Sequence, residues 1–377
     1  MGKIKLLFLV TEFWQAGGQR YTYEIDSALD KKKFESSFLS FRDLNTNPEW
    51  PDYYYKKHIE LGSNIYFYSS LDPKNILLGP SSRRNWIKER SAYKAVNRFL
   101  NKFEVILLQG EWVYNKFQNI FDESNFKKVQ VSILNSVYQF PDNYKGFNKS
   151  KNYSFISGYP EGALKKELAD FSTYKHHFFP LCINLKQEFK WSPESLSSKR
   201  IGVFTRLTKT KPIEPLLYAF SILHSYDNDF ELYIFGNGDP NEVGYSDHLN
   251  YLGIADKVFF KGHQDDIIVS SIESNIGVAW FLGIHGLPAG FAGYDISSIG
   301  LPQLFWDLKP SDKSKSEIIP MFNSLLGLAN KTKELFDDNE LAIELSLKQQ
   351  DYVKENVDIR SFIKEYEANL IKVSKGK

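Results

Sequence analysis

The stretch Arg200–Pro212, RIGVFTRLTKTKP, decides the fold of the second half of the chain. Its apolar residues end at Phe204 and predict a short buried strand, while the apolar residues of Ile213–Leu223 recur at helical spacing. This order predicts a unit of an open α/β sheet, which binds ligands at the carboxyl ends of its strands. Arg206 and Lys211 lie in the loop at that end and suit a diphosphate, so they predict a phosphate clamp. Two solvated surface cations are the alternative.

The length and composition of the chain predict two globular domains. With 377 residues the chain is too long for one compact core, and its 42% apolar content is typical of a folded protein. A net charge of +1 argues against a dedicated nucleic-acid-binding protein. The single cysteine, Cys182, excludes an internal disulfide framework and is typical of a reducing compartment. Because the apolar run Leu6–Val10 is too short to span a bilayer and lacks a cleavage site, we expect a soluble cytoplasmic protein.

The N-terminal half is expected to follow the same scheme, with a buried strand at Lys3–Val10 and a helix at Tyr21–Leu29. The loop between them contains Gly17 and Gly18, which allow close backbone approach and leave amides that can face an anionic or hydroxylated ligand. The third glycine and the spacing of a dinucleotide fingerprint are missing. Two interpretations therefore stay open, a structural turn and a ligand-binding loop.

Glu111 follows another expected strand, Val105–Leu108. An acid at the carboxyl end of a buried strand lies where open α/β sheets bind ligands. A glutamate at the start of a helix also acts as a cap, because it interacts favourably with the helix dipole. We take Glu111 as the candidate ligand contact of this half, with the capping role as the alternative.

The stretch Ser81–Lys102 is strongly basic and has the single acid Glu89. Aromatic and aliphatic residues interleave with the cations, so the stretch predicts an amphipathic helix. One interpretation is that its apolar face packs on the sheet and its basic face is solvated. The other is that the basic face lies on an anionic membrane. The cations are Arg83, Arg84, Lys88, Arg90, Lys94, Arg98 and Lys102.

Three segments resemble, in order and approximate spacing, motifs of the retaining GT-B glycosyltransferases of family four. Arg200–Pro212 is similar to that family's element GRLTPEKG. Glu231–Pro240 (ELYIFGNGDP) resembles its strand and Gly-rich turn, and Gly253–Gly262 (GIADKVFFKG) resembles its segment GLADRVRFLG. Further similarities are GGQRY at 17–21 to the family's GGAER, PLCIN at 180–184 to its IPNGVD crossover, and SFIKEYEANL at 361–370 to its last helix.

The resemblance implies the GT-B fold, an α/β architecture of two Rossmann-like domains whose parallel sheets face each other across a cleft. It implies an acceptor-side domain at 1–183, a nucleotide-sugar domain at 184–358, and a C-terminal helix at 359–377 that returns to the first domain. Because family members often carry an acidic residue or a histidine facing the acceptor at the edge where Glu111 lies, the resemblance also implies that Glu111 contacts the acceptor.

The resemblance also implies that main-chain groups near the second and third strands of the C-terminal domain hold the nucleotide base. The matching positions are Gly236 and Gly262, with His263 beside the latter. A pocket built from main chain does not distinguish uracil, guanine, cytosine and adenine in the sequence.

The chain departs from the family's pattern in the loop before Gly300. The family has two glutamates eight residues apart, and counting back from Gly300 places the second at Asp295, which opens an expected helix and is expected to hold a ribose hydroxyl pair. The first position is Leu287, which neither donates nor accepts a side-chain hydrogen bond. We expect His285 or free amides around Gly290 to contact the donor sugar instead, with an ordinary surface role for His285 as the alternative.

The resemblance implies transfer of a sugar from a UDP- or GDP-linked donor to a hydroxyl of a glycan or lipid-linked glycan, with retention at the anomeric carbon. Arg206 and Lys211 are the expected catalytic cations, because they can stabilise charge developing on the leaving diphosphate without a metal. Asp227 and Asp229 form a DxD-like triplet that we interpret as a turn, and no His/Cys cluster has metal-ligand spacing.

Two rival functions remain open. Loss of the first glutamate, at Leu287, favours a catalytically degenerate scaffold that keeps only the nucleotide clamp. A sugar-nucleotide epimerase would need acid and base side chains whose characteristic motifs the chain lacks. The intact pair Arg206 and Lys211 favours an active transferase of surface polysaccharide synthesis, either free in the cytoplasm or peripheral at the inner face of the membrane.

Overall fold

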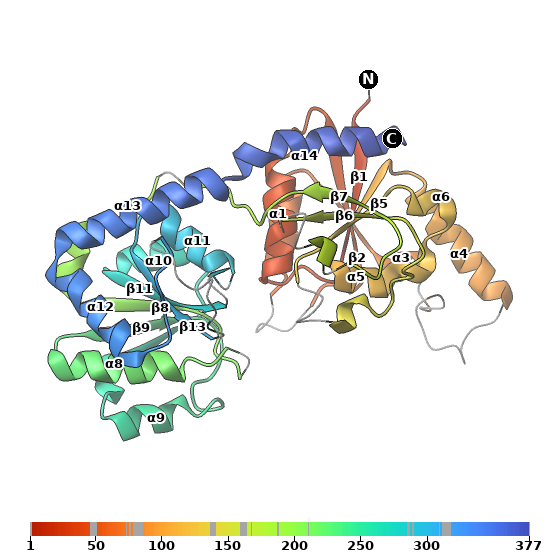
Figure 1. Cartoon of the computed structure of the whole chain (residues 1–377). Coiled ribbons are helices and arrows are strands. Elements are labelled where there is room, and N and C mark those ends of the chain that lie inside the picture. The colour runs from red at the N-terminus through yellow and green to blue at the C-terminus, as the bar shows by residue number, and fades with distance from the viewer. Residues whose placement is uncertain are drawn as a thin grey trace. The chain divides into compact units, whose positions relative to one another are not determined.

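The chain forms two α/β units, which are described separately (Figure 1). The computed structural model describes residues 2–45, 51–72, 74, 77, 86–135, 141–158, 164–166, 168–186, 188–209, 211–284, 287–288, 290–308, 310 and 318–376. Unit 1 comprises Met1–Asn184 and Ile359–Lys377, and unit 2 comprises Leu185–Asp358.

Unit 1 is built on a parallel sheet with the strand order β3-β2-β1-β4-β5-β6-β7. The central strands are continuous apolar runs, as expected for parallel strands that are covered on both faces. The strands are β1 (Ile4–Val10), β2 (Phe34–Ser40), β3 (Asn64–Phe67), β4 (Val105–Leu108), β5 (Val129–Ser132), β6 (Tyr153–Ser157) and β7 (Tyr174–Phe178).

Helices cover both faces of this sheet, and Figure 1 shows α1 and α4 on opposite sides of it. Leu7 and Leu9 of β1 belong to the core cluster that contains Val96 of α4, whereas Phe8 stacks on Phe38 on the other face. This alternation follows from the two-residue period of a strand. The helices are α1 (Gly17–Ala28), α2 (Tyr53–Glu60), α3 (Tyr68–Leu71), α4 (Trp86–Leu100), α5 (Glu111–Phe117), α6 (Glu123–Phe126) and α14 (Ile359–Ser374).

The C-terminal helix α14 belongs to unit 1 although it follows unit 2 in the chain. Its Glu367 carboxylate accepts a hydrogen bond of 2.8 Å from the Asp30 backbone N–H, and its Tyr366 ring lies 4.5 Å from that of Phe179. Both contacts tie α14 to segments more than one hundred residues earlier in the chain.

Unit 2 has a second parallel sheet, with the strand order β10-β9-β8-β11-β13-β14 and the short β12 antiparallel to β11. The strands are β8 (Arg200–Phe204), β9 (Glu231–Phe235), β10 (Val258–Gly262), β11 (Val278–Ile284), β12 (Leu287–Pro288), β13 (Gln303–Asp307) and β14 (Met321–Phe322).

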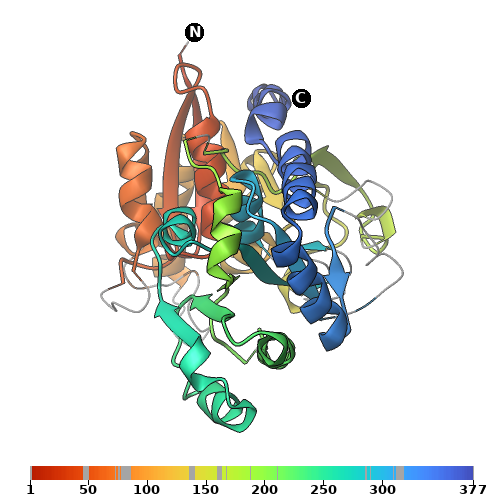
Figure 2. The same ribbon diagram turned by 90° about the vertical axis from the view of Figure 1, so that its left-hand side faces the viewer.

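The helices of unit 2 form two layers around its sheet (Figures 1 and 2). Residues of α8 and α12 share one core cluster with Val203 and Trp280, whereas residues of α10 and α11 share another with Phe204 and Phe281. The helices are α8 (Glu214–Tyr226), α9 (Tyr245–Leu252), α10 (Ile267–Glu273), α11 (Phe291–Ser298), α12 (Leu325–Asp337) and α13 (Asn339–Asn356).

The segment around β11 and α11 differs from the sequence-based expectation. The sequence predicts a strand at 276–280 followed by a Gly-rich loop at 281–291. Strand β11 instead continues through Phe281 to Ile284, because Phe281 and Leu282 are buried and Gly283 still pairs with Asp307 of β13. Helix α11 begins at Phe291. Asp295 therefore lies in the middle of the helix, and the expectation that it opens the helix is wrong.

Candidate functional site

The strand order of unit 2 creates a switch point between β8 and β11. From β8 the chain proceeds outward through β9 to β10, whereas β11 leads to β13 on the other side. Ligands of open α/β sheets bind at the carboxyl ends of the strands flanking such a point. Arg206 follows the carboxyl end of β8, and Gly290 precedes α11 after β11. The topology therefore brings these two predicted residues to one edge of the sheet.

Main-chain hydrogen bonds fix the start of the loop that carries the predicted clamp. The Thr205 N–H donates to the Phe235 carbonyl at 2.9 Å, and the Leu207 N–H donates to the Asn237 carbonyl at 2.7 Å. The Gly236 N–H in turn donates to the Gly262 carbonyl at 2.8 Å. These bonds join the carboxyl ends of β8, β9 and β10 and hold Arg206 between two anchored residues.

Gly236 is required by this close approach of two loops. Its φ is 155°, and a Cβ at this position would lie 1.9 Å from the Thr205 carbonyl oxygen. A side chain would therefore force the β8 and β9 loops apart. The predicted site residue Gly236 thus acts on the shape of the clamp loop.

The two predicted cations lie close enough to interact. Lys211 is half-buried, and burial, followed by the positive charge of Arg206, lowers the pKa of its ammonium. The Lys211 N–H donates to the Thr208 carbonyl at 2.9 Å, which closes the loop into a tight turn. A doubly negative phosphate group would relieve the repulsion between two cations held in this way.

Of the remaining predicted donor residues of unit 2, Gly262, His263 and Gly290 lie at or near the same sheet edge. Gly262 ends β10 with a φ of 68°, and the Nε2 atom of the exposed His263 beside it lies 3.4 Å from the Asp265 carboxylate. Gly290 is exposed before α11, and the Asp295 side chain is buried, with 6% exposure. His285 lies outside the described residues, so its contact with a donor sugar stays a prediction.

In unit 1 the switch point lies between β1 and β4, and the Gly17–Gly18 pair follows β1. Gly17 is exposed at the start of α1. Gly18 is covered by the Trp112 indole, because a Cβ at Gly18 would lie 2.9 Å from that ring. The structural interpretation therefore explains Gly18, whereas Gly17 is exposed.

Glu111 is fully buried, and its carboxylate accepts three hydrogen bonds from the segment after β5. The donors are the Leu134 N–H at 3.0 Å, the Asn135 side-chain amide at 2.6 Å and the Asn143 side-chain amide at 3.0 Å. Burial raises the pKa of this carboxyl, and the hydrogen bonds oppose that shift. Any acceptor that contacts Glu111 must displace one of these donors.

Glu12 was not identified in the sequence, although it follows β1 as Glu111 follows β4. Its carboxylate accepts hydrogen bonds from Thr11 at 2.7 Å and Gln19 at 2.8 Å and lies 3.9 Å from the Arg42 guanidinium. Arg42 also lies 5.1 Å from the Trp14 ring. The position of Glu12 just after strand β1 is the sequence signal that could have identified it.

The structure explains the DxD-like pair by ion pairs with a neighbouring lysine. Asp227 and Asp229 lie between α8 and β9, and both bind Lys199, at 2.6 and 3.4 Å.

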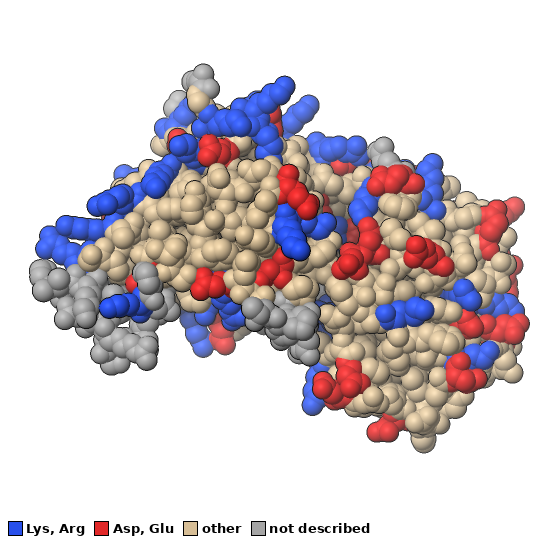
Figure 3. Space-filling view, turned by 180° about the vertical axis from the view of Figure 1, so that it is seen from behind, with Lys and Arg blue, Asp and Glu red and all other residues tan. Residues whose placement is uncertain are grey.

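Helix α4 buries Val96 and Leu100, which confirms the packing predicted for its apolar face. The basic side chains on its described part are exposed at Arg90, Lys94 and Arg98, followed by Lys102, and Figure 3 shows Lys and Arg gathered there.

The described residues contain neither a cluster of metal-ligating side chains nor a helix that could span a membrane. No three or more His, Cys, Asp and Glu side chains come together there as a possible metal site. Within the same part of the chain, every helix is too short or too polar to cross a bilayer.

Comparisons with known proteins identify the fold. No protein-family model matches the chain, and no curated protein matches it in sequence. HepE from Anabaena, solved with UDP and glucose, matches with a TM-score of 0.69 over 97% of this chain and 99% of its own, at 11% identity. Sucrose-phosphate synthase from Thermosynechococcus elongatus matches with a TM-score of 0.69 over 99% and 100%, at 12% identity. A glycosyltransferase from Rickettsia africae matches with 0.66 over the whole of both chains, at 15% identity. With two Rossmann-like units built on parallel sheets, the chain has the GT-B fold of these glycosyltransferases.

Proposed function

We propose that the protein is a glycosyltransferase that moves a sugar from a nucleotide-diphosphate donor to a hydroxyl acceptor. The observation that carries this proposal is the pair Arg206 and Lys211, held in an anchored loop at the switch point of unit 2. The fold supports it, since HepE has been solved in complex with UDP-glucose. UDP- and GDP-linked sugars are the donors we expect, used as substrates without a resident cofactor.

Arg206 and Lys211 act on the leaving group in this proposal. Cleavage of the sugar–phosphate bond develops negative charge on the diphosphate, and preorganised cations stabilise that charge more strongly in the transition state than in the ground state. The lowered pKa of Lys211 indicates that its charge is poorly compensated in the free protein. The diphosphate supplies the missing compensation, so no metal is required, and we expect retention at the anomeric carbon.

The donor is held by groups around the clamp. We assign the nucleotide to main chain near Gly236, Gly262 and His263, and the ribose hydroxyls to Asp295. The sugar is assigned to His285 and to the amides around Gly290, which replace the glutamate missing at Leu287.

The acceptor is assigned to the carboxyl edge of unit 1. The exposed Gly17 amide and the carboxylate of Glu12 offer a donor and an acceptor for a sugar hydroxyl, and Trp112 covers Gly18 beside them. Glu111 acts as a positioning residue in this proposal, because its carboxylate holds the Asn135 side chain through a 2.6 Å hydrogen bond. A glycan or lipid-linked glycan of surface polysaccharide synthesis is the acceptor we propose.

The first test is calorimetric titration with UDP, GDP, CDP and ADP. One nucleotide should bind, and Arg206→Ala and Lys211→Ala should each weaken it by about 1–3 kcal/mol, the contribution of a hydrogen bond to a charged group. Lys209→Ala is the matched control, since Lys209 lies exposed in the same loop. If no nucleotide binds at millimolar concentration, or if the control loses as much affinity, the clamp does not exist.

A degenerate nucleotide-binding scaffold is the second candidate, and Leu287 is the observation that favours it. Both candidates predict nucleotide binding, so slow hydrolysis of the matching nucleotide sugar separates them. Hydrolysis that disappears in Arg206→Ala supports the transferase. Tight binding of the donor without any hydrolysis or transfer supports the scaffold.

We propose a cytoplasmic protein that associates peripherally with anionic membrane through the basic face of α4. Lys94 and Arg98 are exposed on the face opposite the buried Val96, as an interfacial helix requires. Sedimentation with vesicles of phosphatidylglycerol should therefore fall in a Lys94→Gln/Arg98→Gln variant. A variant that neutralises Lys348 and Lys354, both exposed on α13 of unit 2, serves as control, and equal losses in both variants would refute the assignment.

A further inference from the structure

The turn after β9 contains the pair Asn237–Gly238, the only Asn–Gly pair of the sequence. An asparagine followed by glycine is prone to spontaneous deamidation, because glycine has no side chain to hinder attack by its own backbone nitrogen on the asparagine side chain. The reaction therefore depends on how freely the Asn237 side chain and the Gly238 nitrogen can approach each other.

Neither reacting group of this pair is restrained. Asn237 is half-buried and Gly238 is exposed. Within the described part of the chain, neither the Asn237 side-chain amide nor the Gly238 N–H makes a hydrogen bond. The Asn237 carbonyl, by contrast, accepts a hydrogen bond of 2.7 Å from the Leu207 N–H. The turn is therefore anchored, while its two reacting groups are free.

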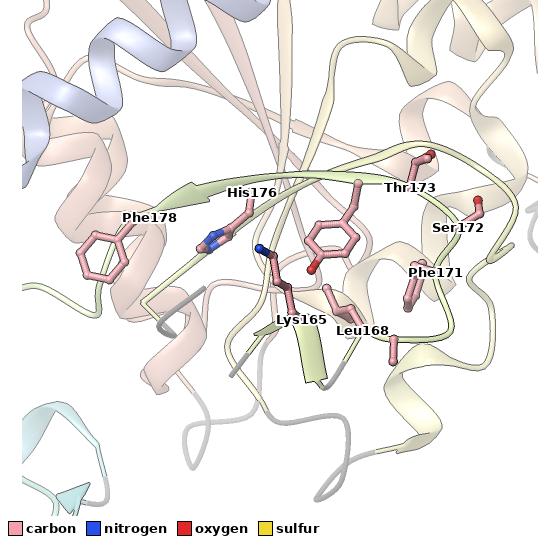
Figure 4. A pocket seen from close by; sticks show the side chains of 9 residues that line it. Lys165, Leu168, Phe171, Ser172, Thr173, His176 and Phe178 are labelled. Carbon is pink, nitrogen blue, oxygen red and sulfur yellow. The ribbon is translucent and has the colours of Figure 1, made fainter. Parts of the chain in front are cut away.

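Other polar side chains of the chain show the restraint that Asn237 lacks. In the groove of about 710 Å³ that lies along β7, the His176 Nε2 atom lies 2.9 Å from the Ser157 hydroxyl (Figure 4). The Asn135 side-chain amide donates a 2.6 Å hydrogen bond to the Glu111 carboxylate. Such contacts hold a side chain in one position, so they would oppose the rotation that deamidation requires.

The packing of the clamp loop requires glycine at position 238. Gly238 has a φ of 123°, and a Cβ there would lie 2.5 Å from the Leu207 carbonyl oxygen. A residue with a side chain would slow deamidation, but it would also displace the loop after β8. The close approach of the two loops therefore keeps a labile Asn–Gly pair beside the phosphate clamp.

We propose that Asn237 is a site of spontaneous deamidation that weakens the phosphate clamp. The Gly238 nitrogen forms a bond to the Asn237 Cγ atom, the Cγ–Nδ2 bond breaks, and ammonia leaves with the Gly238 amide proton. Water then opens the resulting succinimide ring. Hydrolysis at Cγ gives aspartate, whereas hydrolysis at the main-chain carbonyl carbon gives isoaspartate, in which the chain runs through Cγ. Water is the only co-reactant, and no atom is oxidised or reduced.

Both products add a carboxylate to the turn that anchors the clamp loop. Leu207, whose N–H donates to the Asn237 carbonyl, directly follows Arg206 in the chain. In the isoaspartate product this carbonyl becomes part of a carboxylate, so a negative charge takes its place beside the loop. A negative charge there competes with a diphosphate for Arg206 and Lys211. This effect on the clamp rests on the proposed function, whereas the deamidation itself does not.

The first measurement follows the deamidation itself. The full chain is kept in mildly alkaline buffer for several days, and peptide mass spectrometry detects the mass increase of an amide converted to an acid. Asn323 is the internal reference, because it is exposed but is followed by Ser324, whose side chain hinders the attack. Asn237 should convert faster than Asn323, with isoaspartate among the products, and Asn237→Gln should abolish the fast conversion. Equal rates at Asn237 and Asn323 overturn the site.

The second measurement is calorimetric titration with UDP, GDP, CDP and ADP before and after the incubation. The converted chain should bind its nucleotide about tenfold more weakly, the effect of one lost charge-assisted hydrogen bond. Asn237→Asp should reproduce the part of this loss that is due to charge, and Asn237→Gln should keep its affinity throughout. Equal affinity of the fresh and converted chains, or an equal loss in Asn237→Gln, overturns the effect on the clamp. If the fresh chain binds no nucleotide, the proposed transferase is refuted, and the conversion measured by mass spectrometry stands as its own result.

Discussion

Replacement of Gly236 by alanine should damage the clamp loop, because the new side chain would overlap with the backbone of the neighbouring loop. The added Cβ would lie 1.9 Å from the Thr205 carbonyl oxygen and 3.1 Å from the Arg206 nitrogen. Carbon–oxygen contacts normally exceed about 3.3 Å, so the overlap is more than one ångström and involves atoms that no side-chain rotation can move. The positive φ of 155° adds conformational strain.

The expected cost of Gly236→Ala is about 2–5 kcal/mol, the sum of a positive-φ residue and an overpacked contact. Gly253→Ala is the matched control, because Gly253 has a φ of 66° but open space around its Cβ. It should lose only the conformational part, about 1–2 kcal/mol. The control separates the strain of the dihedral angle from the overlap with the β8 loop.

Hydrogen exchange resolved by peptide is the appropriate assay, because two units need not unfold together. In Gly236→Ala, amides of β8 and β9 should exchange faster than in Gly253→Ala, and nucleotide affinity should fall with them. The contacts joining Thr205 to Phe235 and Gly236 to Gly262 should be the first to lose protection. Equal protection and equal affinity in the two variants would refute the argument that close approach requires Gly236.

Three further predictions concern buried charge. Folding lowers the pKa of Lys211 below its usual 10.5. Between the pKa of the folded chain and that of the unfolded chain, the unfolded chain binds more protons, so the free energy of unfolding should rise with pH. Lys211→Met should abolish this rise, as measured by urea unfolding. Burial alone would raise the pKa of Asp26, but the hydrogen bond from His58 and the nearby cations lower it to about 2. Asp26 should therefore contribute about 2 kcal/mol to the free energy of unfolding above pH 3.8, and this contribution should be lost as the pH falls to about 2. Asp26→Asn should remove this dependence in acid unfolding. Glu111→Gln should cost about 1–3 kcal/mol in urea unfolding, because an amide N–H₂ would then face donors such as the Asn135 amide.

Each of these predictions has a contradicting result. A parallel pH dependence of wild type and Lys211→Met would show that this ammonium is not destabilised by folding. An unchanged acid transition in Asp26→Asn would show that the pair with His58, 2.8 Å apart, does not control it. For Glu111→Gln the control is Glu123→Gln at an exposed position, and equal stability of the two variants would contradict the buried role.

The motifs of the second half could be recognised in the sequence because each consists of neighbouring residues in a fixed order. Short apolar runs followed by polar loops predict parallel strands, and the carboxyl ends of parallel strands meet at one edge wherever the strands lie in the sheet. The sequence was therefore enough to place Arg206, Gly236 and Gly262 at a common edge, as the structure confirms. It was also enough for the apolar face of α4, since Val96 and Leu100 recur at helical spacing.

Contacts between distant segments were decided by the tertiary structure. The burial of Glu111 depends on Asn135 and Asn143, which reach it from another strand–loop segment, and local sequence carries no signal for that distance. The cover over Gly18 likewise depends on Trp112 from helix α5, which follows β4.

From its sequence alone, this chain is a two-domain α/β protein with a cationic loop after the first strand of its second half. That much follows from local periodicity, because each strand and helix is specified by neighbouring residues. The strand order decided which loops flank a switch point, and the packing decided that Lys211 is half-buried beside Arg206 while Glu111 is enclosed by amides. Burial and charge compensation depend on atoms brought together from distant positions, so only the folded chain determines which predicted residues are free to meet a ligand.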